Sequence, residues 1–321
     1  MIFKSNKQNI QEAAKAITAG EIVAFPTETV YGLGADGLNP KAVAKIFEAK
    51  QRPSFNPLIL HVSSIEMLKE LIKIEDKRIN KLINKFWPGP LTLVLPKSKT
   101  VPDIVTAGNS TVAVRMPRHP IAKALIEASK TPIAAPSANQ FGYLSPTTAE
   151  HVEKQLGAKV NIILDGGKSD VGVESTIVEI TKDEILLLRH GGISVEQLQE
   201  VCTSVKEKEI DPDKPNAPGQ LLHHYAPKIP VKFINEVTQK EIEGKRLGGL
   251  FLEKNKTEFN FDKIKFLSLR GDLREAAANL FLHLHSLENS KIDLILVEPI
   301  KQEGLGIAIM DRLTKATNRY R

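Results

Sequence analysis

The chain has 321 residues and a formal net charge of +6, and 41% of its residues are hydrophobic and 26% charged. This composition excludes a disordered or fibrous protein and is typical of a soluble globular one, for which the length suits two domains. No apolar run approaches the roughly 18 residues that a membrane span needs, so we expect no association with a membrane.

The cysteine content and the first residues bear on the compartment. Cys202 has no second cysteine with which to form an intrachain disulfide, which suits a reducing environment. The segment MIFKSNKQNI has neither the apolar stretch nor the cleavage site of a signal peptide. We therefore expect a cytoplasmic protein. Its positive charge fits either a lysine-rich surface or an anionic partner such as a nucleotide or RNA.

The first 200 or so residues alternate short β-rich runs with helical patterns. Asn39 before Pro40 is typical of a helix N-cap followed by its first residue, and Ser145-Pro146-Thr147 with Glu150 resembles a capping box. This order predicts an α/β or α+β domain with a mixed twisted sheet. The expected strands are Ile22–Phe25, Leu58–Val62, Leu91–Leu95, Val112–Met116, Pro132–Ala135, Ile162–Leu164, Thr176–Ile180 and Ile185–Leu188. The expected helices are Gln8–Thr18, Pro40–Lys50, Ile65–Ile72, Lys77–Phe86, Ile121–Ser129 and Thr147–Gln155.

The character of the sequence changes near residue 205. The charged segment Lys206–Glu209 and the proline-rich polar segment Asp211–Gly219 have the composition of a linker. Strands and helices alternate again beyond it, which predicts a small second domain with a parallel sheet. The expected division is a first domain over 1–205, a linker over 206–230 and a second domain over 231–321. The second domain's expected elements are strands Val231–Ile234, Gly249–Leu252, Phe266–Leu269 and Leu294–Val297, and helices Thr238–Gly244, Leu273–Leu287 and Leu305–Thr317.

Two glycine motifs that resemble phosphate-binding loops fail on their context. Gly32, Gly34 and Gly37 match G-x-G-x-x-G, but polar residues separate them from the preceding strand and the next helix begins only at Pro40. The segment DGGKS ends like a P-loop, but Ile162 stands where the first glycine is required. Neither a dinucleotide fold nor a Walker motif is therefore predicted.

Histidine pairs do not predict a metal site. His223 and His224 are adjacent and point in different directions, with no third ligand evident. His283 and His285 are two residues apart and would face different sides of a helix. We expect the protein itself to bind no metal.

Cations and polar residues gather where a helix ends and a strand begins, between Lys50 and His61. One explanation for Lys50 and Arg52 is structural: basic residues are favoured at the C-terminal end of a helix, where the helix dipole is negative. Alternatively, with the following Ser54 and Asn56, they provide the fixed positive charges and polar donors that a triphosphate requires.

Other strand ends carry further candidates. Arg115 follows a buried-type strand and would need an acidic or phosphate partner if it is half-buried. The segments Ala134–Ser145 and Asp165–Thr176 are rich in small residues, which let a ligand approach the backbone. Arg189 ends another strand before two glycines. Each feature alone fits a surface arginine or an ordinary turn at least as well as a binding site.

Taken together, these segments resemble the YrdC-like domain of threonylcarbamoyl-AMP synthases over roughly residues 10–200. The resemblance is carried, in order, by FPTETVYGLGAD, KxRPxxNPLILHV, FWPGPLTLVL, VAVRMPxHP, PIAAPSAN and VESTIVE. The segment APGQLLHHYAP, Ala217–Pro227, is similar to the joint of the long, two-domain form of these enzymes. The resemblance implies an α/β fold with a twisted, open mixed sheet and flanking helices around a basic concave cavity, plus a small Rossmann-like C-terminal α/β domain.

The resemblance also implies roles for individual residues, among which Lys50 and Arg52 would be catalytic. Tyr225 of the linker would close over the nucleotide, although relatives often have a basic or aromatic residue near Leu222. Mg²⁺ would arrive with ATP. The L-threonine end would be lined by Thr29, His61, Arg115, Ala135 and Ser175. ATP would be held by Lys50, Arg52, Asn56, Thr111, Ser137, Ser145, Arg189 and Tyr225.

The implied function is an L-threonylcarbamoyladenylate synthase, a nucleotidyltransferase. It would join L-threonine, CO₂ or bicarbonate, and ATP into threonylcarbamoyl-AMP with release of pyrophosphate, for the t⁶A modification at position 37 of tRNAs that read ANN codons. A separate tRNA-modifying transferase complex would act downstream, and weak RNA binding is possible. The alternative is a double-stranded RNA-binding protein without turnover. A carbamoyl-adenylate-forming hydrogenase maturation protein would carry additional zinc-finger segments, which a single cysteine does not support.

Overall fold

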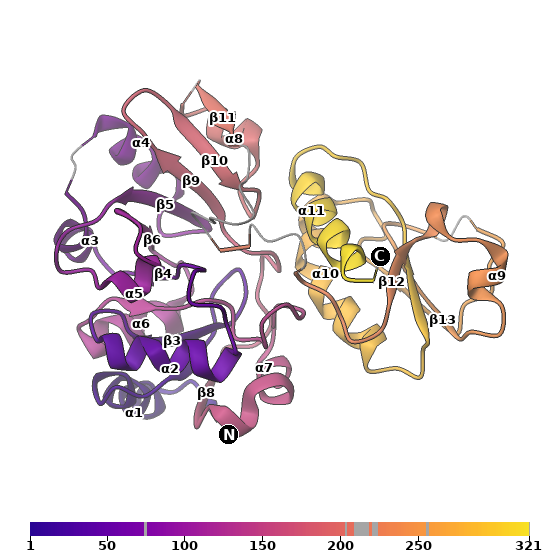
Figure 1. Cartoon of the computed structure of the whole chain (residues 1–321), viewed down its shortest axis with the longest axis horizontal. Coiled ribbons are helices and arrows are strands. Elements are labelled where there is room, and N and C mark those ends of the chain that lie inside the picture. The colour runs from indigo at the N-terminus through magenta and orange to yellow at the C-terminus, as the bar shows by residue number, and fades with distance from the viewer. Residues whose placement is uncertain (74–75, 203, 209–217, 220–223, 255–256, 321) are drawn as a thin grey trace.

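Two β-sheets organise the chain in a computed structural model that describes residues 1–73, 76–202, 204–208, 218–219, 224–254 and 257–320. Figure 1 shows a larger domain built from the N-terminal part of the chain and a smaller one built from the C-terminal part. Most of the predicted linker, with Leu222 and His223, lies outside the described residues.

The larger domain contains an eleven-stranded sheet in the order β1-β8-β2-β3-β7-β4-β6-β5-β9-β10-β11. Some neighbouring strands are parallel, such as β4 and β6, and others antiparallel, such as β5 and β6. This confirms the mixed sheet predicted from the sequence. The strands are β1 (Ile2–Lys4), β2 (Val23–Phe25), β3 (Gly32–Asp36), β4 (Ile59–His61), β5 (Leu91–Pro96), β6 (Thr111–Arg115), β7 (Ile133–Ala134), β8 (Ile162–Asp165), β9 (Thr176–Ile180), β10 (Ile185–Arg189) and β11 (Val205–Glu207).

Helices cover both faces of this sheet because apolar residues on its strands alternate between two cores. Val23 and Phe25 of β2 pack in one core with α1 and α6, whereas Ala24 between them packs in another with Val43 and Ile46 of α2. The helices are α1 (Lys7–Thr18), α2 (Pro40–Lys50), α3 (Ile65–Leu71), α4 (Lys77–Phe86), α5 (Asp103–Thr106), α6 (Pro120–Ser129), α7 (Ala149–Leu156) and α8 (Val195–Gln199), with a 3₁₀ turn over Gly157–Lys159.

Local signals at helix starts succeeded in one case and failed in another. The Asn39 side chain accepts from the backbone N–H groups of Lys41 and Ala42, as expected of an N-cap. The capping box expected at Ser145–Thr147 is wrong, because α7 begins at Ala149 and its N-cap is Thr148. Ser145 is instead drawn into a buried contact with a carboxylate, described below.

Strand β3 was missed because glycine normally disfavours strands. Here the glycines let β3 pack against bulky neighbours. A Cβ at Gly34 would lie 2.6 Å from the Ile133 side chain and 2.7 Å from the ring of Phe25. The glycines of the failed dinucleotide motif therefore serve close packing of the sheet.

The smaller domain has a four-stranded sheet in the order β12-β15-β13-β14, and all three strand pairs are parallel, as predicted. The strand expected at Phe266–Leu269 is wrong, since β14 is an edge strand over Lys263–Phe266 whose alternating lysines hid it. The elements are β12 (Val231–Phe233), a 3₁₀ turn over Ile234–Glu236, α9 (Gln239–Ile242), β13 (Leu247–Phe251), β14, α10 (Leu273–Glu288), β15 (Leu294–Val297) and α11 (Leu305–Asn318).

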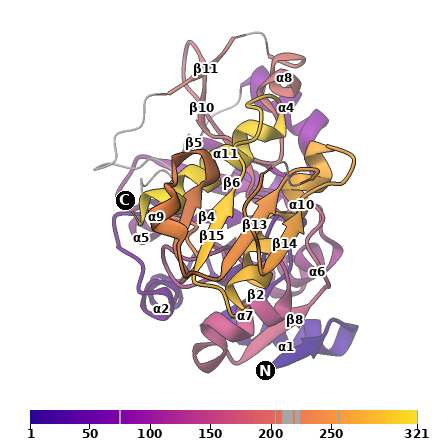
Figure 2. The ribbon, with the colours of Figure 1, turned by 90° about the vertical axis from the view of Figure 1, so that its right-hand side faces the viewer.

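Helices α10 and α11 lie on the side of the small sheet that faces the larger domain (Figure 1), and Figure 2 shows β13, β14 and β15 on the outer side. The contact is close. A Cβ at Gly172 would lie 2.4 Å from the Cα of Ala278 in α10. The rings of His151 and His285 stack across the interface with centroids 3.8 Å apart. Among the described helices, none has the length and apolar character to cross a lipid bilayer.

Candidate functional site

A cavity opens where strand ends of the large sheet meet Pro218, Gly219, His224 and Tyr225. Strands β4 and β6 are parallel, so His61 and Arg115 end at the same edge of the sheet. Strand β5 is antiparallel to β6 and β9 is parallel to β5, so β9 begins at this edge. Strand β10 is antiparallel to β9 and therefore ends there. The edge therefore brings together polar residues that are far apart in sequence.

Most of the predicted site residues line this cavity, which therefore collects them from separate segments. Those in the lining are Thr29, Arg52, His61, Arg115, Ala135, Ser137, Ser175, Arg189 and Tyr225. Those outside the lining are Lys50, Asn56, Thr111 and Ser145. The described lining also includes residues that the sequence analysis did not select, among them Glu174, Pro218, Gly219 and His224.

Arg115 is held rigidly by a buried carboxylate. Its Nη2 lies 2.7 Å from Oε1 of Glu28, and the two side chains are 4% and 2% exposed. Its Nη1 donates to Thr29 Oγ1 at 2.9 Å and its Nε donates to the Gly89 carbonyl at 3.2 Å. Burial raises the pKa of Glu28, but the charge and hydrogen bond of Arg115 outweigh it, so the pKa is lowered overall. Of the acidic or phosphate partner expected for Arg115, the structure shows the acidic one, and it is Glu28 of the same chain.

His61 is a neutral polar group beside this ion pair. Burial, and next the positive charge of Arg115, lower the pKa of His61 to about 3. Its ring packs edge-on against Phe25 with centroids 6.0 Å apart. Within the described part of the chain, Nδ1 of His61 has no hydrogen-bond partner. A buried polar atom of this kind is available to a ligand.

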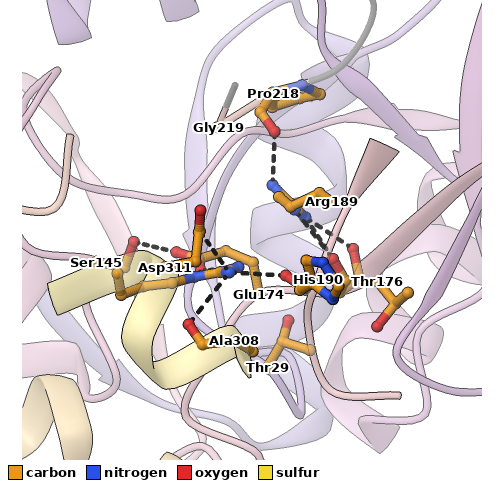
Figure 3. Close-up of polar contacts among 12 residues, drawn as sticks. Thr29, Ser145, Glu174, Thr176, Arg189, His190, Pro218, Gly219, Ala308 and Asp311 are labelled. Carbon is orange, nitrogen blue, oxygen red and sulfur yellow. Dashed lines mark hydrogen bonds and ion pairs between the residues drawn. The ribbon is translucent and has the colours of Figure 1, made fainter. Parts of the chain in front are cut away.

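Arg189 joins the edge of the sheet to Pro218 (Figure 3). Its Nε and Nη2 donate to the Ser175 carbonyl at 3.0 and 2.8 Å, and Nη1 donates to the Pro218 carbonyl at 3.0 Å. Ser175 Oγ also lies 2.7 Å from Thr92 Oγ1. Burial lowers the pKa of Arg189 from its ordinary value. The Arg189 guanidinium therefore holds two parts of the cavity lining in place, one at Ser175 and one at Pro218.

Lys50 and Arg52, the predicted catalytic pair, lie in different positions. Lys50 Nζ donates to the carbonyls of Ser137, at 2.6 Å, and Asn139, so it supports the loop behind the cavity wall. Burial, with a further contribution from Arg52, holds the pKa of Lys50 well below its usual range. Arg52 does line the cavity, and burial lowers its pKa to about 9. Its Nη2 donates to the Pro57 carbonyl at 2.9 Å.

The three other residues outside the lining differ in their surroundings. Asn56 is completely buried, and neither polar atom of its side chain has a partner among the described residues. Thr111 is the half-buried first residue of β6 and pairs with Pro96. Ser145 Oγ donates to Glu174 Oε1 at 2.5 Å. Ser145 thus reaches the cavity only through Glu174.

Tyr225 closes one side of the cavity. Its backbone is left-handed with φ 63°, its side chain is buried, and its ring lies 5.7 Å from that of Phe281 in α10. The ring of His224 packs against it at 4.1 Å. Gly219 also has a positive φ, and a Cβ there would lie 2.6 Å from the Tyr225 hydroxyl oxygen. Only glycine fits between the backbone at this point and the tyrosine.

The carboxylates Glu28 and Glu174 and the arginine Arg312 of α11 were missed. Both glutamates stand in motif segments, but a carboxylate is not an obvious choice beside an anionic ligand. Arg312 lies in the other domain, 138 residues after Glu174, and no local sequence pattern predicts the contact between them.

The charge and chemistry of the cavity favour an anionic ligand. Its described lining includes three arginines, Arg52, Arg115 and Arg189, and a single carboxylate, Glu174. Within the described residues, no group of three or more histidine, cysteine or acidic side chains is placed to hold a metal ion. Ser175 is hydrogen-bonded to Thr92 and Arg189, and neither is a general base of the histidine type. The arrangement is suited to positioning substrates and to stabilising negative charge.

Comparison with known proteins gives consistent relatives. Residues 15–191 match the family described as "Telomere recombination", which groups Sua5, YciO and YrdC proteins, and residues 193–318 match "Threonylcarbamoyl-AMP synthase, C-terminal domain". The threonylcarbamoyl-AMP synthase of Pyrococcus abyssi is 44% identical over 96% of this chain and 94% of its own. That of Bacillus subtilis is 43% identical over 98% and 94%. The crystal structure of P. abyssi Sua5 complexed with L-threonine has a TM-score of 0.90 and 41% identity, covering 99% of this chain and 97% of that one.

Proposed function

This chain belongs to the family of threonylcarbamoyl-AMP synthases, and on that basis we propose that it converts L-threonine, bicarbonate and ATP into threonylcarbamoyl-AMP, pyrophosphate and water. The observation that carries the proposal is the cavity itself, in which three arginines and the neutral His61 converge from separate strand ends and turns. The product serves the t⁶A modification at position 37 of tRNAs that read ANN codons. The enzyme works in the cytoplasm and passes its product to a separate tRNA-modifying transferase complex.

L-Threonine occupies the end of the cavity formed by Thr29, His61, Arg115, Ala135 and Ser175. A relative at 41% identity has been crystallised with this amino acid, which supports the assignment. Arg115 meets the carboxylate, and the neutral groups of His61, Thr29 and Ser175 meet the hydroxyl and the amine. A site that hydrogen-bonds a substrate hydroxyl strongly rejects analogues that lack it, so valine should be excluded.

ATP occupies the remainder of the cavity beside Arg52, Ser137, Arg189 and Tyr225. Arg52 and Arg189 offset the negative charge that grows on the departing pyrophosphate. Lys50 acts through the carbonyls of Ser137 and Asn139, which it holds in place. Mg²⁺ enters with the triphosphate, whose charge it shields. The single carboxylate in the described lining already binds other side chains, which fits a metal held mainly by phosphate oxygens.

The reaction needs no protein nucleophile. Bicarbonate takes up a proton and loses water to give CO₂. The unprotonated amine of threonine adds to CO₂ and loses a proton, which gives a carbamate. A carbamate oxygen then attacks the α-phosphorus of ATP, the bond to the β-phosphate bridging oxygen breaks, and pyrophosphate leaves with that electron pair. The mixed anhydride is labile in water, so enclosure by Tyr225 and its neighbours protects it. Positioning and fixed charge supply the catalysis.

The alternative, a double-stranded RNA-binding protein without turnover, is less favoured because the cations are buried. Arg52, Arg115 and Arg189 are each at most 7% exposed, whereas duplex binding requires basic groups on the surface. The proposal is tested by mass spectrometry after incubation with ATP, Mg²⁺, L-threonine and isotopically labelled bicarbonate. The label should appear in threonylcarbamoyl-AMP. If neither threonylcarbamoyl-AMP nor AMP forms in a way that requires both L-threonine and bicarbonate, the assignment is contradicted.

A further inference from the structure

Glu174 is an unexpected component of a cavity for a triphosphate. Its carboxylate lines the cavity and its side chain is only 8% exposed. A buried negative charge repels phosphate groups and itself requires compensation. The surroundings of Glu174 therefore decide how strongly the cavity attracts ATP.

Arg312 of α11 supplies this compensation from the second domain. Its Nε and Nη2 both lie 3.0 Å from Glu174 Oε2, and its side chain is 0% exposed. The remaining nitrogen, Nη1, donates to the His190 carbonyl at 2.7 Å and lies 3.0 Å from Asp311 Oδ2. Figure 3 shows Glu174, His190 and Asp311 gathered at this point beside the helix that carries Ala308. The guanidinium is thus fixed on three sides.

The ion pair between Arg312 and Glu174 also touches two residues predicted to bind ATP, Ser145 and Tyr225. Oε1 of Glu174, the oxygen that Arg312 leaves free, accepts the hydroxyl hydrogen bond of Ser145 at 2.5 Å. The Arg312 guanidinium carbon also lies 5.2 Å from the centre of the Tyr225 ring. A cation over an aromatic ring is attracted to its face. One side chain of the second domain therefore touches both the acidic group of the cavity and the residue that closes it.

We propose that Arg312 is a positioning residue for the adenylation reaction, which neutralises Glu174 and so allows the triphosphate of ATP to enter the cavity. The inference rests on the proposed function and assigns the second domain a direct part in it. Without Arg312, the Glu174 carboxylate would face the phosphates uncompensated, and ATP affinity would fall. A purely structural tether between the domains would have no such dependence on the charge of Glu174.

Arg319 provides a matched control for the tether. It also extends from the end of α11 to the larger domain, where its guanidinium carbon lies 4.3 Å from the Tyr143 ring centre and Nη1 donates to the Gly142 carbonyl at 3.4 Å. It is exposed and has no contact with Glu174. Arg319→Met removes a contact between the domains without changing the charge at the cavity.

The experiment measures ATP affinity by calorimetry and the KM for ATP in pyrophosphate release, for Arg312→Met, Glu174→Gln and the double variant. Arg312→Met should weaken ATP binding roughly tenfold or more, from the uncompensated charge. The double variant should recover most of this loss, and Arg312→Lys should retain part of the affinity. Arg319→Met should bind ATP like the wild type. A folded Arg312→Met with unchanged ATP affinity, or a loss that Glu174→Gln does not relieve, would overturn the proposal.

The same set of variants tests the proposal in two further cases. If Arg312→Met does not fold, the double variant is compared with Glu174→Gln, and both should bind ATP; a folded double variant that binds ATP tenfold more weakly than Glu174→Gln would refute the role of charge. If the wild type binds ATP but shows no threonine-dependent release, the proposed function fails. The affinity series still decides the role of Arg312 in that case.

Discussion

His61 and Arg115 are register partners on the adjacent parallel strands β4 and β6. Burial and the positive charge of Arg115 together lower the pKa of His61 to about 3. The imidazole is therefore neutral at physiological pH and binds a ligand by hydrogen bonds alone. The positive charge at this end of the cavity belongs to Arg115, which Glu28 holds in place.

The first prediction concerns Arg52. Arg52→Ala should lower threonine-dependent pyrophosphate release about 100-fold or more, because it removes a fixed cation beside the phosphates. Circular dichroism should show that the variant is folded. Lys159→Ala is the control, since Lys159 also binds the end of α2, through the Ala49 carbonyl, but lies outside the cavity lining. Normal release by Arg52→Ala would remove Arg52 from the catalytic account.

The second prediction concerns the buried ion pair. Glu28→Gln leaves the charge of Arg115 without its partner, so the free energy of unfolding should fall by about 3 kcal/mol. Urea unfolding at neutral pH measures this change. Glu21→Gln breaks the exposed pair with Lys45, whose atoms lie 2.8 Å apart, and should have a much smaller effect. Equal effects of the two substitutions would show that burial does not strengthen the Glu28 pair.

The third prediction concerns the closure by Tyr225. Gly219→Ala should displace the tyrosine, because the new Cβ would lie 2.6 Å from its hydroxyl oxygen. The labile product would then be less protected, and the ratio of pyrophosphate released to threonylcarbamoyl-AMP recovered should rise. Gly108→Ala imposes a similar backbone strain at φ +81°, with no neighbour within 4 Å of its Cβ, and should leave this ratio unchanged. An unchanged ratio in Gly219→Ala would mean that Tyr225 does not shield the product.

The fourth prediction concerns acid stability at the domain interface. Burial lowers the pKa of His151 to about 4 and that of His285 to about 3, from an ordinary value of 6.5. As pH falls below 6.5, these two histidines become protonated in the unfolded chain but stay neutral in the folded chain. The free energy of unfolding therefore decreases. His285→Gln does not titrate and can still donate to the Ser145 carbonyl, which lies 3.2 Å from His285 Nε2.

Urea unfolding at pH 7 and pH 5 tests this prediction. The wild type should lose more stability on acidification than His285→Gln does, since the variant lacks one of the two stacked buried imidazoles. Identical losses would show that His285 does not contribute to the pH dependence.

Local sequence signals predicted many of the elements, but not the contacts between them. Helix α2 was predicted with its observed bounds because Asn39 and Pro40 mark its start and a turn follows Lys50. Strand β3 was missed because Gly34 serves packing against Phe25 and Ile133, and no strand pattern reveals that neighbourhood.

The candidate site shows the same division. The motif residues Thr29, His61, Arg115 and Arg189 converge on one cavity. Lys50 lies behind the cavity wall instead. Its side chain binds the loop at Ser137, more than 80 residues away in sequence, and local patterns do not predict such a contact. Arg312 was beyond local inference for the same reason, because it acts through a carboxylate in the other domain. The roles of the site residues and the boundaries of the domains stay predictions.

The most direct test of the central claim is pyrophosphate release from ATP and Mg²⁺, measured with L-threonine, L-serine, L-valine or no amino acid, each with and without bicarbonate. We predict release that requires both L-threonine and bicarbonate, is weaker with L-serine and is absent with L-valine. Release that is independent of threonine, or its absence from a folded and monodisperse sample, would contradict the account and favour the RNA-binding alternative, for which salt-dependent binding of duplex RNA is the decisive assay.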